Sequence, residues 1–378
     1  MKIILSLCIL LLSVAKAAEI ESLFKSKETV NVSASQFVEK HGDFQWEGEN
    51  QRVAISKKST VVGFSAYESL AYFTATGKLV RLDSWLYNKG DQEKMSVDAF
   101  EKMYLDVLQK LSAYFGVKPK RFAKDGATRG LAYSFMIGQK HEVRLLVGFD
   151  KKKKEANYLS LVMRNYATSD RVNSEAKTKA FLEKTATGDV YITKIPMIDQ
   201  GDKGYCVPAT LTRIGQHYGV DVSMHELAMV AHSSSDGGTS PSKAMDAVKK
   251  GRIALSIRDI KVSFFSKSNP YFLSPGEIRS MAKEITDKDR NMAKFEKEII
   301  KRIDRGRMLA WSMMVGAFPE KGVREGTWGG HMRMIVGYNA KTKEVLYSDS
   351  WGRGHEVKRW PLKYAYLVTT RLYEVVPR

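Results

Sequence analysis

Cysteine is scarce in this sequence of 378 residues, which contains only Cys8 and Cys206. Cys8 lies in an N-terminal segment that we expect to be removed, so the mature chain keeps one thiol and forms no internal disulfide. An unpaired thiol in an exported protein is open to oxidation. Cys206 is therefore either a buried, inert packing residue or a residue kept for its reactivity.

The sequence also lacks long apolar runs, glycine-rich phosphate loops and groups of histidine, cysteine and carboxylate residues at metal-ligand spacing. The first absence predicts that no segment of the mature chain spans a membrane. The other two predict that the protein uses no metal ion and no organic cofactor.

The N-terminal segment has the order of a secretory signal peptide. Lys2 provides a positive charge, residues 3–14 form a short apolar run, and Ala15 and Ala17 are small residues of the kind found at a cleavage site. The run is too short to cross a bilayer. We therefore predict a signal peptide over residues 1–17, cleavage after Ala17, and a periplasmic or secreted protein.

Positive charge is in large excess, with a formal net charge of +19. Removing the two lysines of the signal peptide, Lys2 and Lys16, lowers this to +17. The basic residues are spread along the chain rather than gathered with aromatic residues into one patch, so no specific nucleic-acid binding is predicted. The dense run at residues 151–154 is typical of a solvated turn. The charge predicts only a non-specific attraction to anionic surfaces.

The remaining residues are too many for one comfortable core and fit two domains. The pattern of residues 18–166 predicts an α+β domain. In it, a hairpin turns at Thr76-Gly77 and a helix runs from a capping Ser96 to Gly116. The predicted strands of this domain cover residues 68–75, 78–88, 131–137, 142–149 and 157–164. The domain shows no nucleophile or ligand cluster, so its role stays open between an inhibitory pro-segment, a targeting module and a substrate-presenting domain.

A polar stretch over residues 167–188 predicts a linker, and a second domain follows over residues 189–378. Helices come first in it, opening near residues 206, 223, 240 and 274, the last with a break near residue 287. Strands follow over residues 308–315, 331–338, 345–350 and 364–375. A helical part followed by an antiparallel sheet makes the whole chain α+β.

The segment before the first of these helices has features that activate a thiol. A cysteine at a helix N-terminus meets unpaired backbone amides and the positive end of the helix dipole, which favour the thiolate. Gly201 and Gly204 let the backbone turn tightly before Cys206. Gln200, six residues upstream, can place its amide beside the sulfur and form an oxyanion hole with the backbone N–H of Cys206.

Of the seven histidines, His331 is the best placed to pair with this thiol. It follows Gly329-Gly330 and opens a predicted strand, which places an imidazole at the mouth of a sheet. A catalytic thiolate needs such a cationic partner, which later donates its proton. Asp349 ends the next strand, so a hairpin would bring its carboxylate beside His331 to orient the ring. Trp351 would shield their hydrogen bond from water.

Together these motifs resemble the papain-like cysteine peptidases: Gln-x5-Cys at a helix start, Gly-His before a strand, and then Asp-Ser-Trp-Gly. The segment from Ile195 to Cys206 is more similar to the bacteriocin-processing, double-glycine-leader (C39-like) branch, which uses aspartate as its third residue where papain uses asparagine. The resemblance covers residues 186–378 and implies Cys206 as nucleophile, His331 as general acid/base, Asp349 as its orienting residue and Gln200 as oxyanion donor. Tyr205 departs from the papain pattern, in which a small residue precedes the nucleophile.

We therefore predict an exported cysteine peptidase that hydrolyses a peptide or related amide bond by acyl transfer, with a peptide or protein as its substrate. Two alternatives stay open. The same residues would serve an isopeptidase or an acyltransferase. A papain fold that has lost its activity would instead bind peptide or glycan in the old cleft, although it would have no need to retain all four site residues.

Overall fold

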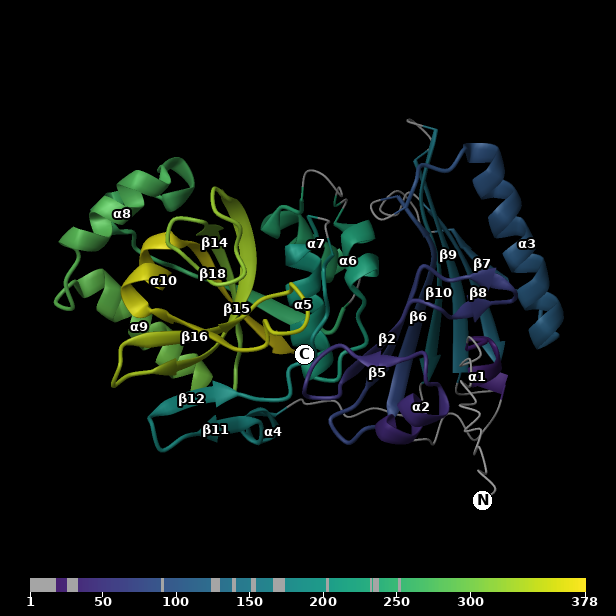
Figure 1. Cartoon of the computed structure of the whole chain (residues 1–378), viewed down its shortest axis with the longest axis horizontal. Helices are drawn as coiled ribbons and strands as arrows, with labels where there is room; N and C mark the ends of the chain where they lie inside the picture. The colour runs from purple at the N-terminus through teal and green to yellow at the C-terminus, as the bar shows by residue number, and fades with distance from the viewer. Residues whose placement is uncertain are drawn as a thin grey trace, which may run out of the picture.

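The computed structural model describes residues 18–25, 33–89, 92–123, 130–137, 141–150, 154–165, 174–201, 204–231, 233, 238–250 and 253–378. The predicted signal peptide and residues 151–153 of the basic run lie outside these ranges. Two large sheets dominate the structure, and the strand pairings described within each are antiparallel. Figure 1 shows them side by side, the purple and blue N-terminal half next to the teal-to-yellow C-terminal half. The predicted α+β class is confirmed.

The N-terminal sheet has the strand order β1-β2-β5-β6-β10-β9-β8-β7. Its strands are β1 (Gln45–Trp46), β2 (Val53–Ser56), β5 (Glu68–Phe73), β6 (Leu79–Asn88), β7 (Lys120–Ala123), β8 (Gly130–Ile137), β9 (His141–Asp150) and β10 (Glu155–Asn165). The hairpin predicted around Thr76-Gly77 is present as the antiparallel pair β5 and β6. Two short helices, α1 (Ser22–Lys25) and α2 (Ala34–Lys40), and the small hairpin of β3 (Thr60–Val61) and β4 (Phe64–Ser65) complete this half.

One long helix, α3 (Val97–Phe115), covers the outer face of this sheet (Figure 1). Ser96 accepts a hydrogen bond from the backbone N–H of Ala99 and caps the helix start, and Gly116 ends it in the left-handed conformation with φ of 66°. These are the helix limits that the sequence predicts. The buried residues of α3, among them Val107 and Leu111, pack into a core with the strands beneath.

The opposite face of the N-terminal sheet is buried as well. Successive side chains of a strand point to opposite faces. On β5, Ala71 and Phe73 join the core under α3, whereas Leu70 and Tyr72 join a second apolar cluster that contains residues of the C-terminal half. The N-terminal sheet is therefore a middle layer, with α3 on one side and the C-terminal half on the other.

The C-terminal sheet has the order β11-β12-β15-β14-β18-β13, with β16 and β17 added beside β15. Its strands are β11 (Leu182–Lys184), β12 (Asp189–Ile192), β13 (Leu255–Ile260), β14 (Leu309–Val315), β15 (Gly329–Asn339), β16 (Glu344–Ser348), β17 (Lys358–Pro361) and β18 (Thr369–Pro377). Its helices are α4 (Glu175–Lys179), α5 (Cys206–His217), α6 (Met224–Val230), α7 (Pro241–Lys250), α8 (Pro275–Glu284), α9 (Arg290–Ile303) and α10 (Leu362–Val368), with short turns η2 (Phe265–Lys267) and η3 (Pro270–Phe272).

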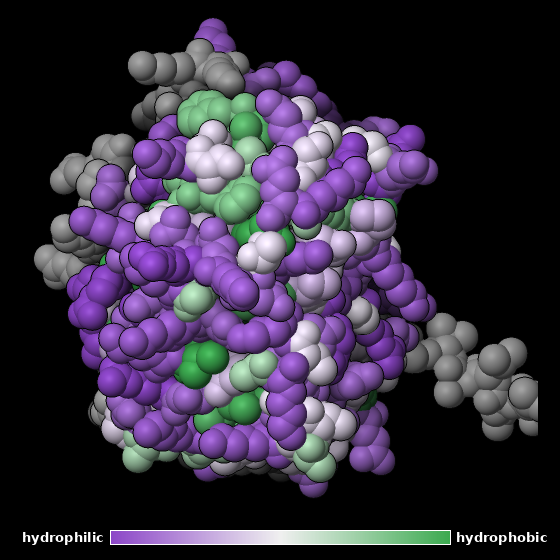
Figure 2. All heavy atoms as spheres, turned by 90° about the vertical axis from the view of Figure 1, so that its left-hand side faces the viewer, coloured by the Kyte–Doolittle hydropathy of each residue, from purple (hydrophilic) through white to green (hydrophobic). Residues whose placement is uncertain are grey.

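Helices α5, α6 and α7 lie between the two sheets, and α8, α9 and α10 lie on the far side of the C-terminal sheet (Figure 1). The far side of this half presents a largely hydrophilic surface with a few small apolar patches (Figure 2). Within the described part of the chain, no helix has the length and hydropathy of a membrane span.

Three features of the C-terminal half differ from the sequence prediction. The segment 364–375, predicted as one strand, instead contains most of helix α10 and then β18. A short apolar run fits the spacing of a strand as well as that of a helix. Here the buried residues Leu362, Ala365 and Tyr366 follow the helical spacing. Strands β11, β12 and β13 precede the later strands. Helix α4 and β11 occupy part of the predicted linker 167–188, and β11 pairs with β12 in the C-terminal sheet.

Candidate active site

Cys206 is the first residue of α5, which follows a turn at Tyr205. The body of α5 is buried, but Cys206 itself is only partly buried and is unpaired. The start of a helix presents N–H groups without intrahelical partners and the positive end of the dipole. The fold therefore places the thiol of a partly buried residue where the backbone favours its ionised form.

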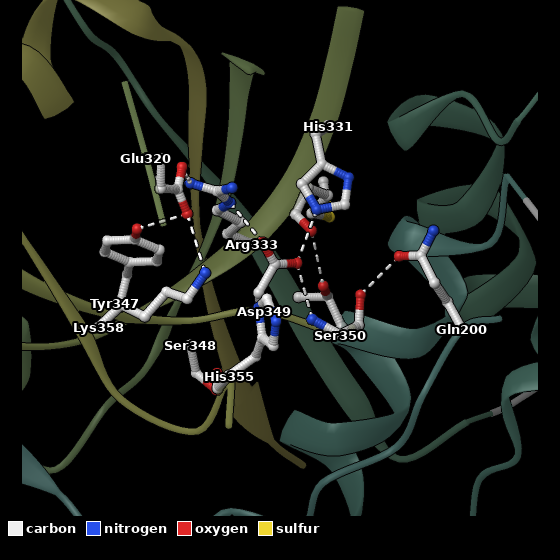
Figure 3. A network of polar contacts seen from close by, with 12 residues as sticks. Gln200, Glu320, His331, Arg333, Tyr347, Ser348, Asp349, Ser350, His355 and Lys358 are labelled. Carbon is white, nitrogen blue, oxygen red and sulfur yellow. Dashed lines mark hydrogen bonds and ion pairs between the residues drawn. The ribbon is translucent and has the colours of Figure 1, made fainter. Parts of the chain in front are cut away.

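His331 and Asp349 are brought together by the β15–β16 hairpin. His331 lies near the start of β15, and Asp349 follows the last residue of β16. The His331 Nε2 is 2.7 Å from Asp349 Oδ1, and the backbone N–H of Ser350 donates to the same oxygen at 2.8 Å (Figure 3). His331 is 8% exposed and Asp349 is fully buried, so this contact is protected from water.

Trp351 covers the histidine, as the sequence predicts. Its ring stacks on the imidazole of His331, with centroids 4.6 Å apart and planes 22° from parallel. The next residue, Gly352, has φ of 78°, and a Cβ there would lie 2.8 Å from Asp199 Oδ2. The glycine of the Asp-Ser-Trp-Gly motif is therefore required both for the turn and for the close approach of the segment that leads to Gln200.

Gln200 lies beside the same loop. The Ser350 hydroxyl donates to Gln200 Oε1 at 2.7 Å, and the Gln200 backbone N–H donates to the Ser350 carbonyl at 2.8 Å (Figure 3). Because the amide oxygen is held by Ser350, the orientation of the amide group is fixed and its NH2 end lies on the side away from Ser350. Gln200 is buried at 7% exposure, so little water competes for it.

The charges of the thiol and the imidazole are coupled. Burial alone raises the pKa of the Cys206 thiol, but a hydrogen bond and the charge of His331, together with the Met332 backbone, lower it overall. Burial alone lowers the pKa of His331, but Asp349 and then Cys206 raise it to about 9. With Nε2 of His331 bonded to Asp349, Nδ1 is the ring nitrogen left for the thiol. The lowered pKa of the thiol and the raised pKa of the imidazole both favour the thiolate–imidazolium pair over the neutral pair.

An arginine and a glutamate behind Asp349 were not predicted from the sequence. Arg333 Nε forms an ion pair with Asp349 Oδ2 at 2.7 Å, and its Nη1 donates to Glu320 Oε2 at 2.9 Å (Figure 3). The guanidinium is fully buried and also lies over the ring of Tyr347, 4.9 Å from its centroid. The signal was present, because residues two apart on a strand share a face and Arg333 follows His331 by two.

A second buried arginine joins the segments of the site. Arg213, on α5, donates to the carbonyl of Pro196 at 2.8 Å, to the carbonyl of Asp349, and to Ser348 Oγ at 2.6 Å. It therefore ties the helix of Cys206 to the loop of Asp349 and to the segment that leads to Gln200. The sequence prediction missed this residue too, because it lies on the buried side of the helix.

The structure thus brings together all four residues singled out from the sequence: Gln200, Cys206, His331 and Asp349. Within the described ranges, no group of three or more histidine, cysteine, aspartate and glutamate side chains is arranged to hold a metal ion.

Comparisons with known proteins find a matching family model and matching solved structures. The model of the Peptidase_C39 like family matches residues 192–372. A crystal structure of xylellain, a cysteine protease from Xylella fastidiosa, aligns at 13% sequence identity, covering 56% of this chain and 92% of that chain, with a TM-score of 0.31. No curated protein matches the chain.

Proposed function

Residues 192–372 are similar to the Peptidase_C39 like family, and from this premise we propose that the protein is an exported cysteine peptidase. We propose Cys206 as its nucleophile, His331 as general acid and base, Asp349 as the residue that orients His331, and Gln200 as an oxyanion donor. The observation that carries this proposal is the chain of contacts from a half-buried thiol at a helix start, through His331, to the buried Asp349 at 2.7 Å.

The reaction is acyl transfer in two steps. The Cys206 thiolate attacks the carbonyl carbon of the scissile amide, and the carbonyl oxygen takes the negative charge between the Cys206 backbone N–H and the Gln200 amide. The His331 imidazolium donates its proton to the leaving nitrogen, the C–N bond breaks, and a thioester with Cys206 remains. Water then attacks the thioester, His331 accepts a proton from that water, and the carboxylic acid product leaves with the thiolate restored.

Asp349 keeps His331 in its productive orientation. Because its carboxylate accepts at Nε2, it fixes the proton there and leaves the other ring nitrogen for the thiol and the leaving group. Arg333 and the Ser350 backbone hold the carboxylate in place and favour its ionised form. The pKa of Asp349 is lowered accordingly: burial raises it, but His331 and then Arg333 outweigh that effect.

An acyltransferase or isopeptidase would form the same thioester and differ only in the amine that is released or accepted. A binding module without activity is the less favoured alternative, because it needs neither the thiol's contact with His331 nor the arginine that holds Asp349.

Activity is tested with the chain from residue 18 onward on a library of peptides, with cleavage followed by mass spectrometry. We expect wild type to cleave a subset, and both Cys206→Ala and wild type treated with iodoacetamide to cleave none. If wild type and Cys206→Ala give identical spectra for peptides, isopeptides and acyl acceptors, the catalytic proposal is wrong. New amide products in the presence of added amines would instead identify an acyltransferase.

Export is tested separately, by measuring the mass of the protein recovered from outside the cytoplasm of a bacterial host. We expect an N-terminus at Ala18. A protein that keeps residues 1–17 and stays in the cytoplasm would contradict this part of the proposal.

A further inference from the structure

The inner face of the N-terminal sheet packs directly on the segments that carry the site. Strands β2, β5 and β6 share one apolar cluster with the C-terminal half, whose buried members are Val53, Leu70, Tyr72, Ile198, Ala209 and Met224. Ile198 lies two residues before Gln200, and Ala209 lies one turn of α5 after Cys206. A single apolar core therefore joins the two halves immediately behind the thiol and the glutamine.

An aromatic ladder reaches the start of α5 from the same sheet. The ring of Trp85, on β6, lies against His225 of α6 with centroids 3.5 Å apart, and Tyr158 of β10 meets Trp85 edge-on at 6.3 Å. His225 in turn meets Tyr205 edge-on at 5.9 Å. Tyr205 directly precedes Cys206 in the chain, so Trp85 is connected through His225 to the residue before the nucleophile.

The other end of α5 is held by the N-terminal half as well. Arg52 donates from Nη2 to the carbonyl of Gln216, in the last turn of α5, and from Nη1 to the carbonyl of Lys194, both at 3.1 Å. Carbonyls in the last turn of a helix lack intrahelical partners, and a cation there complements the dipole. Asn50 donates to the carbonyl of Ile195, on the segment that leads to Gln200.

Charged residues complete the junction. Arg81, 2% exposed, forms ion pairs with Asp83 at 2.6 Å, Asp221 at 2.8 Å and Glu226 at 3.2 Å. Arg164 of β10 pairs with Asp221 at 2.6 Å and Glu226 at 2.8 Å. Asp221 and Glu226 belong to the C-terminal half, so both buried arginines form ion pairs across the junction.

We propose that the N-terminal half is a permanent part of the catalytic unit that holds α5 at both ends, with Trp85 and Arg52 as positioning residues for Cys206. This inference rests on the proposed peptidase function and assigns that half a role. A removable inhibitory segment is a poor fit, because its loss would expose the shared apolar cluster to water and would remove Arg52 from the end of α5.

The test uses the full mature chain and follows alkylation of Cys206 by iodoacetamide from acidic to alkaline pH, beside kcat and KM for a cleaved peptide. We expect Trp85→Ala and Arg52→Met to lower kcat and the alkylation rate at acidic pH by about 10- to 100-fold, because small displacements of a reacting group have effects of this size. Trp85→Phe should restore most of the loss. Leu111→Ala is the matched control, since it opens a cavity of similar kind under α3, away from α5.

The outcomes separate the two proposals. A wild-type thiol that reacts only near its ordinary pKa overturns the peptidase proposal and this inference with it. An activated wild-type thiol with Trp85→Ala indistinguishable from Leu111→Ala, both folded by near-ultraviolet circular dichroism, overturns the inference alone. Faster cleavage in Trp85→Ala or Arg52→Met overturns it as well, because relief of inhibition has the opposite sign. If Trp85→Ala does not fold, Arg52→Met and Trp85→Phe decide between these outcomes.

Discussion

Two buried ionic networks lie on either side of the helix layer that contains α5. One joins Arg81 and Arg164 of the N-terminal sheet to Asp221 and Glu226, and the other joins Arg333 of the C-terminal sheet to Glu320 and Asp349. Both pair a nearly inaccessible guanidinium with carboxylates at hydrogen-bonding distance. Only the second continues into an imidazole and the thiol of a partly buried cysteine.

The comparison separates burial from reactivity. Arginine stays charged at all relevant pH values, so a network of arginines and carboxylates supplies neither a nucleophile nor an imidazole. Adding His331 and Cys206 supplies two groups whose proton can move between them. We therefore call the network of Arg81 and Arg164 the junction network and that of Arg333 the catalytic network. The following experiments test this distinction.

The largest difference is expected from matched changes of the two aspartates. Asp349→Asn should lower kcat by about 10³- to 10⁴-fold, because an orienting carboxylate replaced by an amide leaves the histidine in the wrong tautomer. Asp83→Asn, the same change in the junction network, should lower kcat far less. Steady-state kinetics on folded protein measure both, and equal losses would contradict the distinction.

Replacing one arginine in each network should separate an effect on stability from an effect on catalysis. Arg81→Met should lower the free energy of unfolding by about 3–5 kcal/mol, since removing one partner leaves buried charges uncompensated. Arg333→Met should cost a similar amount and also lower kcat about tenfold or more, through misplacement of Asp349. Urea denaturation and kinetics test the pair; Arg333→Met with unchanged kcat would reduce Arg333 to a structural residue.

The two networks should also respond to pH in different ranges. The folded-state pKa of His331 is raised to about 9, so its contribution to stability is present below its ordinary pKa and is lost as pH rises through 9. The pKa of Asp83 is raised to about 6, mainly by burial, so its contribution is lost as pH rises from about 4 through 6. The free energy of unfolding of each variant, measured against pH, tests this. Its pH dependence should become flatter than that of wild type up to about pH 9 in His331→Gln, and between about pH 4 and 6 in Asp83→Asn.

The smallest effect is expected at Glu47, where the N-terminal half approaches Asp199. The pKa of Glu47 is raised to about 7 by burial and then by the charge of Asp199. Its protonated form suits the folded state, so stability is lost as pH rises through 7. Glu47→Gln should therefore match wild type at pH 4 and be more stable at pH 8, by thermal denaturation. A variant less stable than wild type at both pH values would contradict this prediction. It would show that the Glu47 carboxylate makes a favourable contact that outweighs its repulsion by Asp199.

Most of the candidate site could be predicted because its signals are local in sequence. Cys206 sits at a helix start marked by glycines and a proline, and His331 and Asp349, 18 residues apart, come from one hairpin. Helix α3 could be predicted from its serine and glycine caps. Such features depend on short-range geometry that the chain encodes within one or two elements.

The junction could not be predicted for the opposite reason. Arg81 and Asp83 alternate along β6 as polar residues do on a solvent-facing side of a strand. Their burial depends on Asp221 and Glu226, about 140 residues further along the chain. The pattern on one strand cannot show which distant surface will cover it. The same limit hid Arg213, whose acceptors are the carbonyls of Pro196 and Asp349 and the hydroxyl of Ser348.

The central claim is that folding ionises Cys206 through His331, and titration of the thiolate tests it most directly. The chain from residue 18 onward has one cysteine, so the difference in ultraviolet absorbance between wild type and Cys206→Ala reports that group alone. We expect the thiolate signal to persist at pH values well below the ordinary cysteine pKa of about 8.5 and to be lost there in His331→Ala. A thiolate that appears only near pH 8.5 in wild type would contradict the account.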